Sequence, residues 1–262
     1  MRHLRDATVG DLWFHFGKAS GHDVGAVAAS WTDQPGFALV EVASRCDDGQ
    51  TRVELSQRRF STTGRATAAL WQIPVVLSHD GTSSTVLLNK PTQALLLPGC
   101  PAQPTLLNPA GDGFYRVACA PAQRTRLSAS DPQLPAAAQV TLLSDTFALA
   151  QAGSLPMADD LDLLTALPQV QGSGRAALFA QAGTGLNFLA LARAATPAQA
   201  PLFVAARALL APELDAVGWL PRTGEDSETE AQRSAQIVQL AKFDDPATVA
   251  RAGPVRRRRG GA

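Results

Sequence analysis

The spacing of apolar residues changes at Pro35-Gly36, and this change divides the chain. Before these residues, apolar positions recur three and four residues apart, which is the spacing of one helix face. From Phe37 onward they follow one another or alternate with polar residues, as in a β-strand. The stretch from Trp31 to Val42, reading WTDQPGFALVEV, therefore predicts the passage from helical to sheet structure.

Two short helices are predicted before this boundary. Thr8 and Asp11 have the spacing of a capping box, which satisfies the free N–H groups at a helix start. This first helix is expected to run to about Lys18 and to be ended by Gly21, and Asp23 is the expected cap of the second. The second helix has a single apolar stripe, formed by Val24, Val27, Ala28 and Trp31.

Short apolar or alternating runs separated by turn residues follow, up to about Cys119, and they predict an antiparallel β-sandwich. Hairpin turns are expected at Asp47 to Gln50 and at Asp80-Gly81, because glycine accepts the positive φ that such turns need. Pro74 has no N–H for a ladder, so its strand is expected at a sheet edge or with a bulge. The expected strands are residues 37–44, 51–60, 70–78, 84–89, 93–97, 104–108 and 113–119.

After Pro121 the sequence becomes rich in Ala and Leu and predicts an all-helical region. One helix is expected over residues 140–151 with Gly153 as its C-terminal cap, and another after Asp159-Asp160, where acidic residues suit the helix dipole. Further helices are expected over 202–210 and after Ser227 and Glu230, which have capping-box spacing. Successive pairs of short helices are compatible with a stacked solenoid.

Charge and hydropathy restrict the partners that can be expected. Lys plus Arg and Asp plus Glu number 23 each, so no global field favours nucleic acid or an anionic membrane. The run from Arg256 to Arg259 has no aromatic platform beside it and is interpreted as a solvated tail. The longest apolar run, near residues 201–212, contains Arg207 and is far shorter than the roughly 20 residues of a membrane span. The charged residues 1–13 lack a signal-peptide core, which favours a cytoplasmic location.

The three cysteines, Cys46, Cys100 and Cys119, are too few and too scattered to predict a disulfide framework. No C-x-x-C pair is present to hold a metal. The three residues are therefore expected to act as small buried apolar side chains without a redox role.

Several longer phrases of the sequence resemble one family of enzymes. In addition to WTDQPGFALVEV they are LSQRRF (55–60), WQIPV (71–75), LLNPAGDGFYRV (106–117), LLSDTFALAQAG (142–153) and GWLPRTGEDSETEAQRSAQIV (218–238). In their order and approximate spacing they are similar to the zinc aminopeptidase family of the aminopeptidase N and puromycin-sensitive type.

This resemblance implies a multi-domain α and β architecture. Residues 1–36 would be the last helices of a thermolysin-like catalytic domain, 37–120 a β-sandwich, and 121–262 the first part of an all-α solenoid of the ARM/HEAT kind. Residues 169–200 depart from the family pattern, and the ending GPVRRRRGGA does not continue it, so the chain is expected to be cut short or shifted out of frame at that end. At its start it is expected to be cut short, because residues 1–36 resemble only the tail of the catalytic domain. The lost contacts would leave an exposed apolar patch at Leu12, Trp13, Phe16 and Trp31.

The family's peptide hydrolysis needs zinc held by two His and a Glu, with a general-base Glu from H-E-x-x-H. It also needs a Gly-x-Met-Glu-Asn stretch and a tyrosine that steadies the oxyanion. Neither sequence motif occurs in this chain, and the sole tyrosine, Tyr115, is expected to be a core ring with a hydrogen-bonded hydroxyl. The histidines are expected to be structural or surface residues: His3, His15, His22 and His79.

Other candidate motifs have simpler interpretations. Residues Gly172 to Ala177 fit G-x-G-x-x-A, but a helical run precedes them and no acidic residue lies between Asp162 and Glu213, so a glycine-rich connection is expected. The cluster Asp159, Asp160 and Asp162 is interpreted as helix capping rather than acid–base chemistry. No phosphate-binding loop and no G-x-S-x-G elbow is present.

The sequence thus predicts the C-terminal, non-catalytic portion of a metallopeptidase that removes N-terminal amino acids from peptides. No catalytic, cofactor-binding or metal-binding residue is predicted in this chain, and zinc would belong to the missing catalytic domain. The expected partners are peptides, in the intact enzyme, and a separate catalytic-domain polypeptide. The alternative is a freestanding non-catalytic module that binds peptides or a partner protein on its helical surface.

Overall fold

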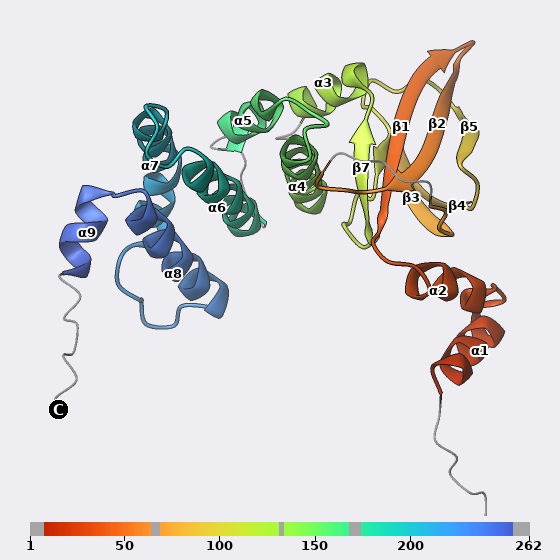
Figure 1. Ribbon diagram of the computed structural model, residues 1–262, viewed down its shortest axis with the longest axis horizontal. Helices are drawn as coiled ribbons and strands as arrows, with labels where there is room; N and C mark the ends of the chain where they lie inside the picture. The colour runs from red at the N-terminus through yellow and green to blue at the C-terminus, as the bar shows by residue number, and fades with distance from the viewer. Residues whose placement is uncertain (1–7, 64–68, 131–133, 168–173, 254–262) are drawn as a thin grey trace, which may run out of the picture. The chain divides into compact units, whose positions relative to one another are not determined.

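A computed structural model describes residues 8–63, 69–130, 134–167 and 174–253 of the chain, and Figure 1 shows its elements. The chain divides into two compact units, residues 1–163 and 164–262. The first contains the strands and the early helices, and the second contains the later helices. None of the helices in the described part of the chain is long and apolar enough to cross a membrane.

Two helices begin the described chain, α1 (Val9–Ser20) and α2 (Val24–Thr32). The capping box is confirmed: the Asp11 carboxylate accepts the Thr8 N–H at 2.8 Å, and Thr8 Oγ1 accepts the Asp11 N–H at 3.2 Å. Gly21 adopts a φ of 73° and ends α1, as predicted. Asp23 caps α2 by accepting the Ala26 N–H at 3.0 Å. Short polar side chains therefore set both helix starts.

Seven strands follow in the described part of the first unit: β1 (Ala38–Asp47), β2 (Gln50–Arg59), β3 (Ile73–His79), β4 (Thr82–Leu88), β5 (Thr92–Pro98), β6 (Leu106–Leu107) and β7 (Tyr115–Cys119). They form a four-stranded sheet in the order β5-β2-β1-β7 and a three-stranded sheet in the order β4-β3-β6. Each run predicted as a strand overlaps one of them.

The sheets are mostly, but not wholly, antiparallel. β1 and β7 pair in parallel, with Ala38 opposite Tyr115 and Val42 opposite Cys119, so the expectation of a purely antiparallel arrangement is wrong at this pair. The reason is topological. The chain leaves the three-stranded sheet at β6 and enters the four-stranded sheet beside β1 in the same direction as β1.

The expectation for Pro74 is also wrong for its strand as a whole, because β3 lies in the middle of its sheet. However, β6 pairs with β3 only at Leu77 and Ser78, whereas β4 pairs along the whole strand. At Pro74 the strand therefore has one neighbour, and the absent N–H removes no bond to β6.

One buried apolar core is shared by the two sheets. Alternate residues of the strands point into it, as the alternating sequence predicts. Its members, on the strands and just before β3, are Ala38, Val40, Val42, Val53, Leu55, Trp71, Ile73, Val75, Leu77, Leu88, Leu107, Tyr115 and Val117. Trp31 of α2 packs against this core, with its ring centroid 6.0 Å from that of Trp71, and its Nε1–H donates to the Gln72 carbonyl at 3.1 Å.

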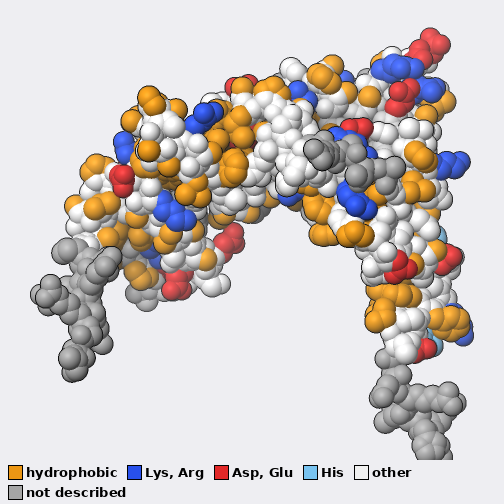
Figure 2. All heavy atoms as spheres, viewed as in Figure 1, with side chains coloured by type: hydrophobic (Ala, Val, Ile, Leu, Met, Phe, Trp, Pro, Cys, Tyr) orange, Lys and Arg blue, Asp and Glu red, His pale blue; other side chains and the backbone are white. Residues whose placement is uncertain are grey.

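The expected exposed apolar patch is therefore correct only in part. Leu12 and Phe16 on α1 are 48 % and 51 % exposed, and no residue of α1 is buried. Figure 2 shows hydrophobic side chains at the surface over α1. Trp13 and Trp31, in contrast, are half-buried. Trp31 is covered because α2 is held against the sheets by the contacts of its ring.

The interpretation of the cysteines is wrong for two of them. Cys46 and Cys100 form a disulfide bond, and both residues are exposed rather than buried. The hairpin end of β1 and the segment after β5 meet because β5 pairs with β2 over its whole length, which brings Gly99 next to Thr51. Cys119 is a half-buried free thiol.

Three more helices follow the strands: α3 (Pro121–Ser130), α4 (Ala136–Gln151) and α5 (Met157–Ala166). The sequence did not predict α3, and α4 begins four residues before the expected Val140. Asp145 joins α4 to β7, because its carboxylate accepts the Val117 N–H at 2.8 Å and an Arg116 N–H at 3.0 Å. Burial raises the pKa of Asp145 to about 6, against the effect of these two donors.

The second unit consists of helices in its described part: α6 (Arg175–Ala192), α7 (Gln199–Val217), α8 (Ser227–Lys242) and α9 (Pro246–Ala252). Helix α8 packs on α6, α7 and α9. Its cap is Asp226, which accepts the Thr229 N–H at 2.7 Å, so the predicted capping box at Ser227 is misplaced by one residue. The buried apolar side chains of these helices and of the turn after α8 are Leu178, Phe179, Ala182, Leu186, Leu189, Ala206, Leu210, Leu214, Leu240 and Phe243.

Ion pairs also lie within this helical unit. Arg175 at the start of α6 donates through Nε to Glu213 of α7 at 2.9 Å, and its guanidinium lies 4.8 Å from the Phe179 ring centre. Arg233 of α8 is buried, pairs with Glu225 and donates to a backbone carbonyl at 2.8 Å. Arg175 thus connects α6 to α7, and Arg233 connects α8 to the end of α7.

Candidate functional site

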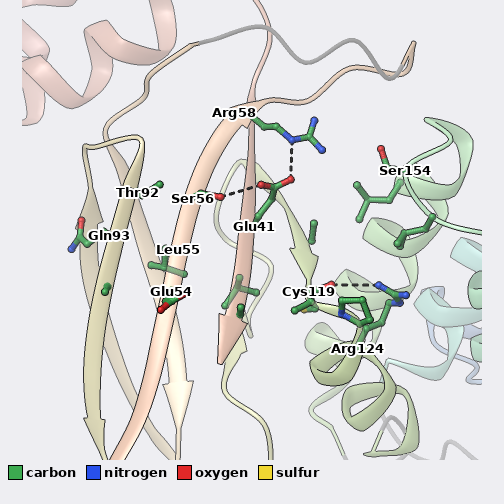
Figure 3. A pocket seen from close by; sticks show the side chains of 18 of the residues that line it. Glu41, Glu54, Leu55, Ser56, Arg58, Thr92, Gln93, Cys119, Arg124 and Ser154 are labelled. Atoms are coloured by element: carbon green, nitrogen blue, oxygen red, sulfur yellow. Dashed lines mark hydrogen bonds and ion pairs between the residues drawn. The ribbon is translucent and has the colours of Figure 1, made fainter. Parts of the chain in front are cut away.

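A pocket lies on the outer face of the four-stranded sheet, within the first unit (Figure 3). Its volume is about 890 Å³. Strand alternation explains its lining, since the side chains between the core positions of β1 and β2 must point outward. The polar lining residues are Glu41, Arg52, Glu54, Ser56, Arg58, Thr92, Gln93, Cys119, Arg124 and Ser154. Residues from α3 and from the loop between α4 and α5 border one side.

Charged groups of both signs meet in this pocket. Glu41 accepts from Ser56 Oγ at 3.0 Å and from Arg58 Nε at 2.9 Å, and Figure 3 shows it between these two residues. Glu54 accepts from Arg52 Nε at 2.9 Å. This hydrogen bond, with the charge of a second arginine, holds the pKa of Glu54 below its usual value. The pocket therefore presents paired charges at neutral pH.

Arg124 and Cys119 define the other side of the pocket. Arg124 forms an ion pair with Asp159 at 2.8 Å and donates to the Cys119 carbonyl at 3.4 Å. Burial raises the pKa of the Cys119 thiol to about 12, and the charge of Asp145 acts in the same direction. The thiol therefore stays protonated at neutral pH and is a poor nucleophile. The arrangement is suited to binding a ligand with charges of both signs and offers no activated nucleophile.

The positions of the histidines decide whether they could hold a zinc ion together. His15 and His22 are exposed on α1 and just after it, and His3 lies outside the described residues. His79 is buried in β3, where its ring nitrogens lie 2.9 Å from Thr105 Oγ1 and 3.0 Å from the Pro98 carbonyl. In the described residues no three His, Cys, Asp or Glu side chains are grouped to hold a metal. These residues therefore do not fit the family's zinc.

The other candidates are placed as follows. Tyr115 is a buried core ring, as expected, but its buried hydroxyl has no hydrogen-bond partner among the described residues; burial raises the pKa of Tyr115 to about 12. Asp159 and Asp160 lie in the first turn of α5, in agreement with their interpretation as acidic residues at a helix start, and the side chain of Asp160 is buried. Asp162 is exposed.

Gly174 is the N-cap of α6, and Arg175 to Ala177 belong to this helix and not to the predicted glycine-rich connection. Residues 168–173 and the arginine run lie outside the described residues.

The sequence did not predict the pocket residues, although part of the information was present. Glu41, Ser56 and Arg58 occupy the polar positions of alternating strands, which indicated an outer sheet face. What was missing was the pairing of β1 with β2, which places Glu41 opposite Ser56. Arg124 lines the pocket because it lies on α3, a helix that the sequence did not predict.

The phrases that carry the family resemblance contact one another in the first unit. Gln57 of LSQRRF accepts the Trp71 N–H of WQIPV at 2.8 Å and donates to the Trp71 carbonyl at 2.9 Å. Asp145 of LLSDTFALAQAG accepts the Val117 N–H that ends LLNPAGDGFYRV. Gly113 in that phrase has no space for a side chain, since an added Cβ would lie 2.2 Å from the Tyr115 ring. The family-like phrases therefore lie where these secondary-structure elements contact one another.

A family model described as the ERAP1-like C-terminal domain matches residues 105–256, which is more than half of the chain. The chain belongs to this family. The matched region of the ERAP1-like C-terminal domain begins just before β6 and extends beyond α9.

Similar proteins carry aminopeptidase names. This member of the ERAP1-like C-terminal domain family is 28 % identical over 255 residues to aminopeptidase M1-A of Oryza sativa subsp. japonica, which covers 93 % of the chain and 28 % of that protein. It is 28 % identical over 162 residues to puromycin-sensitive aminopeptidase of Caenorhabditis elegans, covering 58 % of the chain and 17 % of the relative. A third relative is aminopeptidase 2 of Candida albicans, 27 % identical over 92 % of the chain and 26 % of that protein. The predicted resemblance is confirmed, and the chain spans less than a third of these relatives.

Proposed function

We propose that this chain is the C-terminal, non-catalytic portion of a zinc aminopeptidase that removes N-terminal amino acids from peptides. It would supply the scaffold and part of the wall of a peptide cavity, and it would be inactive alone. The observation that supports this most is the family match, together with the hydrogen bonds of Gln57 and Asp145, through which the family-like phrases contact one another.

The domain arrangement follows from the same proposal. Residues 1–36 would complete a catalytic domain, 37–120 would be a β-sandwich, and 121–262 would begin an ARM/HEAT-like solenoid. The exposed apolar side chains of α1 support the first assignment, since a helix with no buried residue is usually covered by something else. The zinc and the peptide would be held by a catalytic portion, here a separate polypeptide or a missing domain.

The test is an activity and metal measurement on the purified chain. After incubation with zinc and dialysis, we expect no stoichiometric metal by elemental analysis and no release of amino acid from aminoacyl reporter substrates. An intact aminopeptidase of the same family, treated in parallel, is the positive control. Robust turnover that a chelator abolishes would contradict the proposal.

The charged pocket supports one alternative, a freestanding module that binds peptides on the outer face of the sheet. A peptide with free termini offers an ammonium and a carboxylate, which Glu41 and Arg58 would match. In this case Glu41→Gln is expected to weaken the binding of labelled peptides at least about tenfold, and Lys90→Gln on the surface is expected to leave it unchanged. An adjacent upstream reading frame that encodes H-E-x-x-H would favour the enzyme portion instead.

A further inference from the structure

The four-stranded sheet ends at β5, beyond which no other strand lies among the described residues (Figure 1). The Gln57 N–H donates to the Pro91 carbonyl at 3.0 Å, and this bond continues the ladder between β2 and β5 by one pair. Bonded and non-bonded pairs alternate in an antiparallel ladder, so every second residue of β5 bonds to β2. The others, Thr92, Ala94 and Leu96, direct their backbone N–H and C=O groups outward, where no described residue bonds to them.

The outer edge of β5 lacks the features that usually keep an exposed edge from pairing, which are charged side chains, prolines and bulges. None of these occurs from Thr92 to Leu97, where the ladder with β2 is unbroken, and Leu96 is 62 % exposed. The opposite edge of the sheet, β7, is different. There the Asp145 carboxylate of α4 accepts the Val117 N–H at 2.8 Å. In this sheet, β5 is therefore the edge that is open to another strand.

The edge strand of the other sheet, β4, offers a contrast and a control. The Asn108 N–H donates to the Val76 carbonyl at 2.8 Å, so Val76 bonds toward β6. Its partner on β4, Thr85, therefore directs its N–H away from β3. Residues 82–85 of β4 are exposed serines and threonines, whereas β5 exposes Leu96. Pairing at β5 thus covers more apolar surface than pairing at β4.

The outward groups of β5 are complementary to themselves. When two copies of β5 run antiparallel with Ala94 opposite Ala94, Thr92 of each copy lies opposite Leu96 of the other. All of these residues direct their backbone groups toward the second copy, so each pair exchanges two hydrogen bonds. The two-fold axis between the Ala94 residues closes the contact, and the assembly stops at two copies.

Charge at the ends of β5 agrees with this register. Lys90, just before β5, lies opposite Pro98 of the second copy, beside the hairpin end of β1 and β2. Lys90 is exposed, and no ion pair of its side chain is found in the described part of the chain. The hairpin segment 45–54 contains three carboxylates and two arginines, which leaves it one net negative charge: Asp47, Asp48, Glu54, Arg45 and Arg52. Each copy thus places a lysine toward a segment of opposite net charge.

We propose that β5 is a homodimer interface, through which two copies of this chain join their four-stranded sheets into one continuous sheet. The contact uses no residue of the proposed aminopeptidase function and holds or fails independently of it. Pairing of two short edges covers less surface than a standard interface, so the dissociation constant is expected to be on the order of 10–100 µM.

The test is sedimentation equilibrium of the full chain. The average mass is expected to rise from that of one chain toward that of two chains over roughly 1 to 500 µM. Ala94→Pro removes the outward N–H at the centre of the contact without removing a bond to β2, and it should raise the dissociation constant at least about tenfold. Thr85→Pro, the same kind of change at the edge of β4, is the matched control and should alter it by less than about twofold.

A second pair of variants covers the case in which proline unfolds an edge strand. Leu96→Lys introduces a charge into the apolar edge and should also raise the dissociation constant at least about tenfold. Leu87→Lys on β4, at a leucine that is 41 % exposed, is its control. Circular dichroism and urea unfolding identify the variants that remain folded.

Cross-linking tests the register. In a chain with Cys119→Ala, Ala94→Cys places two thiols opposite each other at the two-fold axis, whereas Thr92→Cys faces Leu96 of the second copy. Opposite residues of a bonded pair lie within disulfide reach, so mild oxidation should give the covalent dimer at least about fivefold faster with Ala94→Cys.

Several results would overturn the proposal. One is the mass of a single chain at every concentration. Another is association that neither Ala94→Pro nor Leu96→Lys weakens, which would place the contact elsewhere, such as on the exposed face of α1. An equal loss with Thr85→Pro would assign the contact to β4 instead. Faster trapping of Thr92→Cys than of Ala94→Cys would exclude this pairing of the two strands.

Discussion

The sheets of the first unit and the helices of the second unit bury their polar side chains in different ways. In the sheets, Gln57 is a neutral amide that bonds only to backbone groups, including the carbonyl of Leu88 at 3.2 Å. In the helices, Glu213 and Arg233 are buried charged groups with charged partners. Gln57 satisfies backbone groups at and beside strand ends, whereas helices satisfy their own backbone except at their ends, where Arg233 donates to the Gly218 carbonyl. The side chains of helices are then free to pair with each other.

The largest effect is expected from Gln57→Leu, which tests the sheet side of this comparison. The change removes the partner of the Trp71 N–H and of three carbonyls, all at buried or half-buried places. Unsatisfied buried groups cost about 1–3 kcal/mol each, and some relaxation is expected, so the free energy of unfolding should fall by about 4 kcal/mol.

Urea unfolding followed by circular dichroism measures this change. Gln93→Leu on β5 is the matched control, since no hydrogen bond of its side chain is found in the described structure, and its expected effect is under about 0.5 kcal/mol. A Gln57→Leu protein as stable as the control would show that the amide does not join the two sheets.

The second largest change in the free energy of unfolding is expected from the ion pair between Arg175 and Glu213, which tests how the helices bury charged side chains. Glu213→Leu leaves the guanidinium of Arg175 without its carboxylate, and we expect a loss of about 3 kcal/mol. Adding Arg175→Met should restore most of it, because two apolar side chains of similar volume can replace a buried pair. Unfolding of the two variants in urea distinguishes the cases. A double variant as unstable as Glu213→Leu would mean that Arg175 acts through its other contacts.

Asp160 in α5 follows neither of these two ways of burying polar side chains. Its effect on the free energy of unfolding is expected to be smaller than the effects of the two changes above and to depend on pH. Its side chain is buried, no hydrogen bond reaches its Oδ1 in the described structure, and burial raises its pKa to about 7. A carboxyl group whose pKa is higher in the folded state than in the unfolded state contributes a stabilising free energy that is fully present at low pH. This contribution is lost as the pH rises from about 4 through 7.

Relative to Asp160→Asn, the native chain should therefore lose stability across this range, by an amount on the order of 2 kcal/mol. Unfolding at a series of pH values measures the difference, and Asp162→Asn, an exposed neighbour on α5, is the control. A difference between the native chain and Asp160→Asn that does not change between pH 4 and 7 would show that this carboxyl is ionised normally.

The sheet elements were predictable because their residues repeat with a period of two. β1 and β2 have alternating core positions, and their turn at Asp48-Gly49 adopts the positive φ that the sequence indicates. The helix α3 was missed because PAQRTRLSAS has few apolar residues with which to show a period. Helices α6 and α7 have apolar residues on several faces, so their boundaries were poorly defined by sequence.

The pocket and the disulfide bond were not predictable, for a different reason. Cys46 and Cys100 are 54 residues apart, and nothing in that spacing indicates that the pairing of β5 with β2 brings them together. Glu41 and Arg58 likewise meet only because of strand register. Sequence patterns determine which face of an element a side chain occupies, whereas sites of this kind depend on which elements become neighbours.

The contact between Trp31 and Trp71 has a spectroscopic consequence. Two indole rings 6.0 Å apart, inclined by 40°, couple their electronic transitions and produce a paired positive and negative band in far-ultraviolet circular dichroism. Trp219 lies in the other unit, beneath the guanidinium of Arg251 at 5.7 Å, and is not part of this pair. The native chain thus contains an intrinsic optical reporter of whether α2 is seated on the sheets, without any added label.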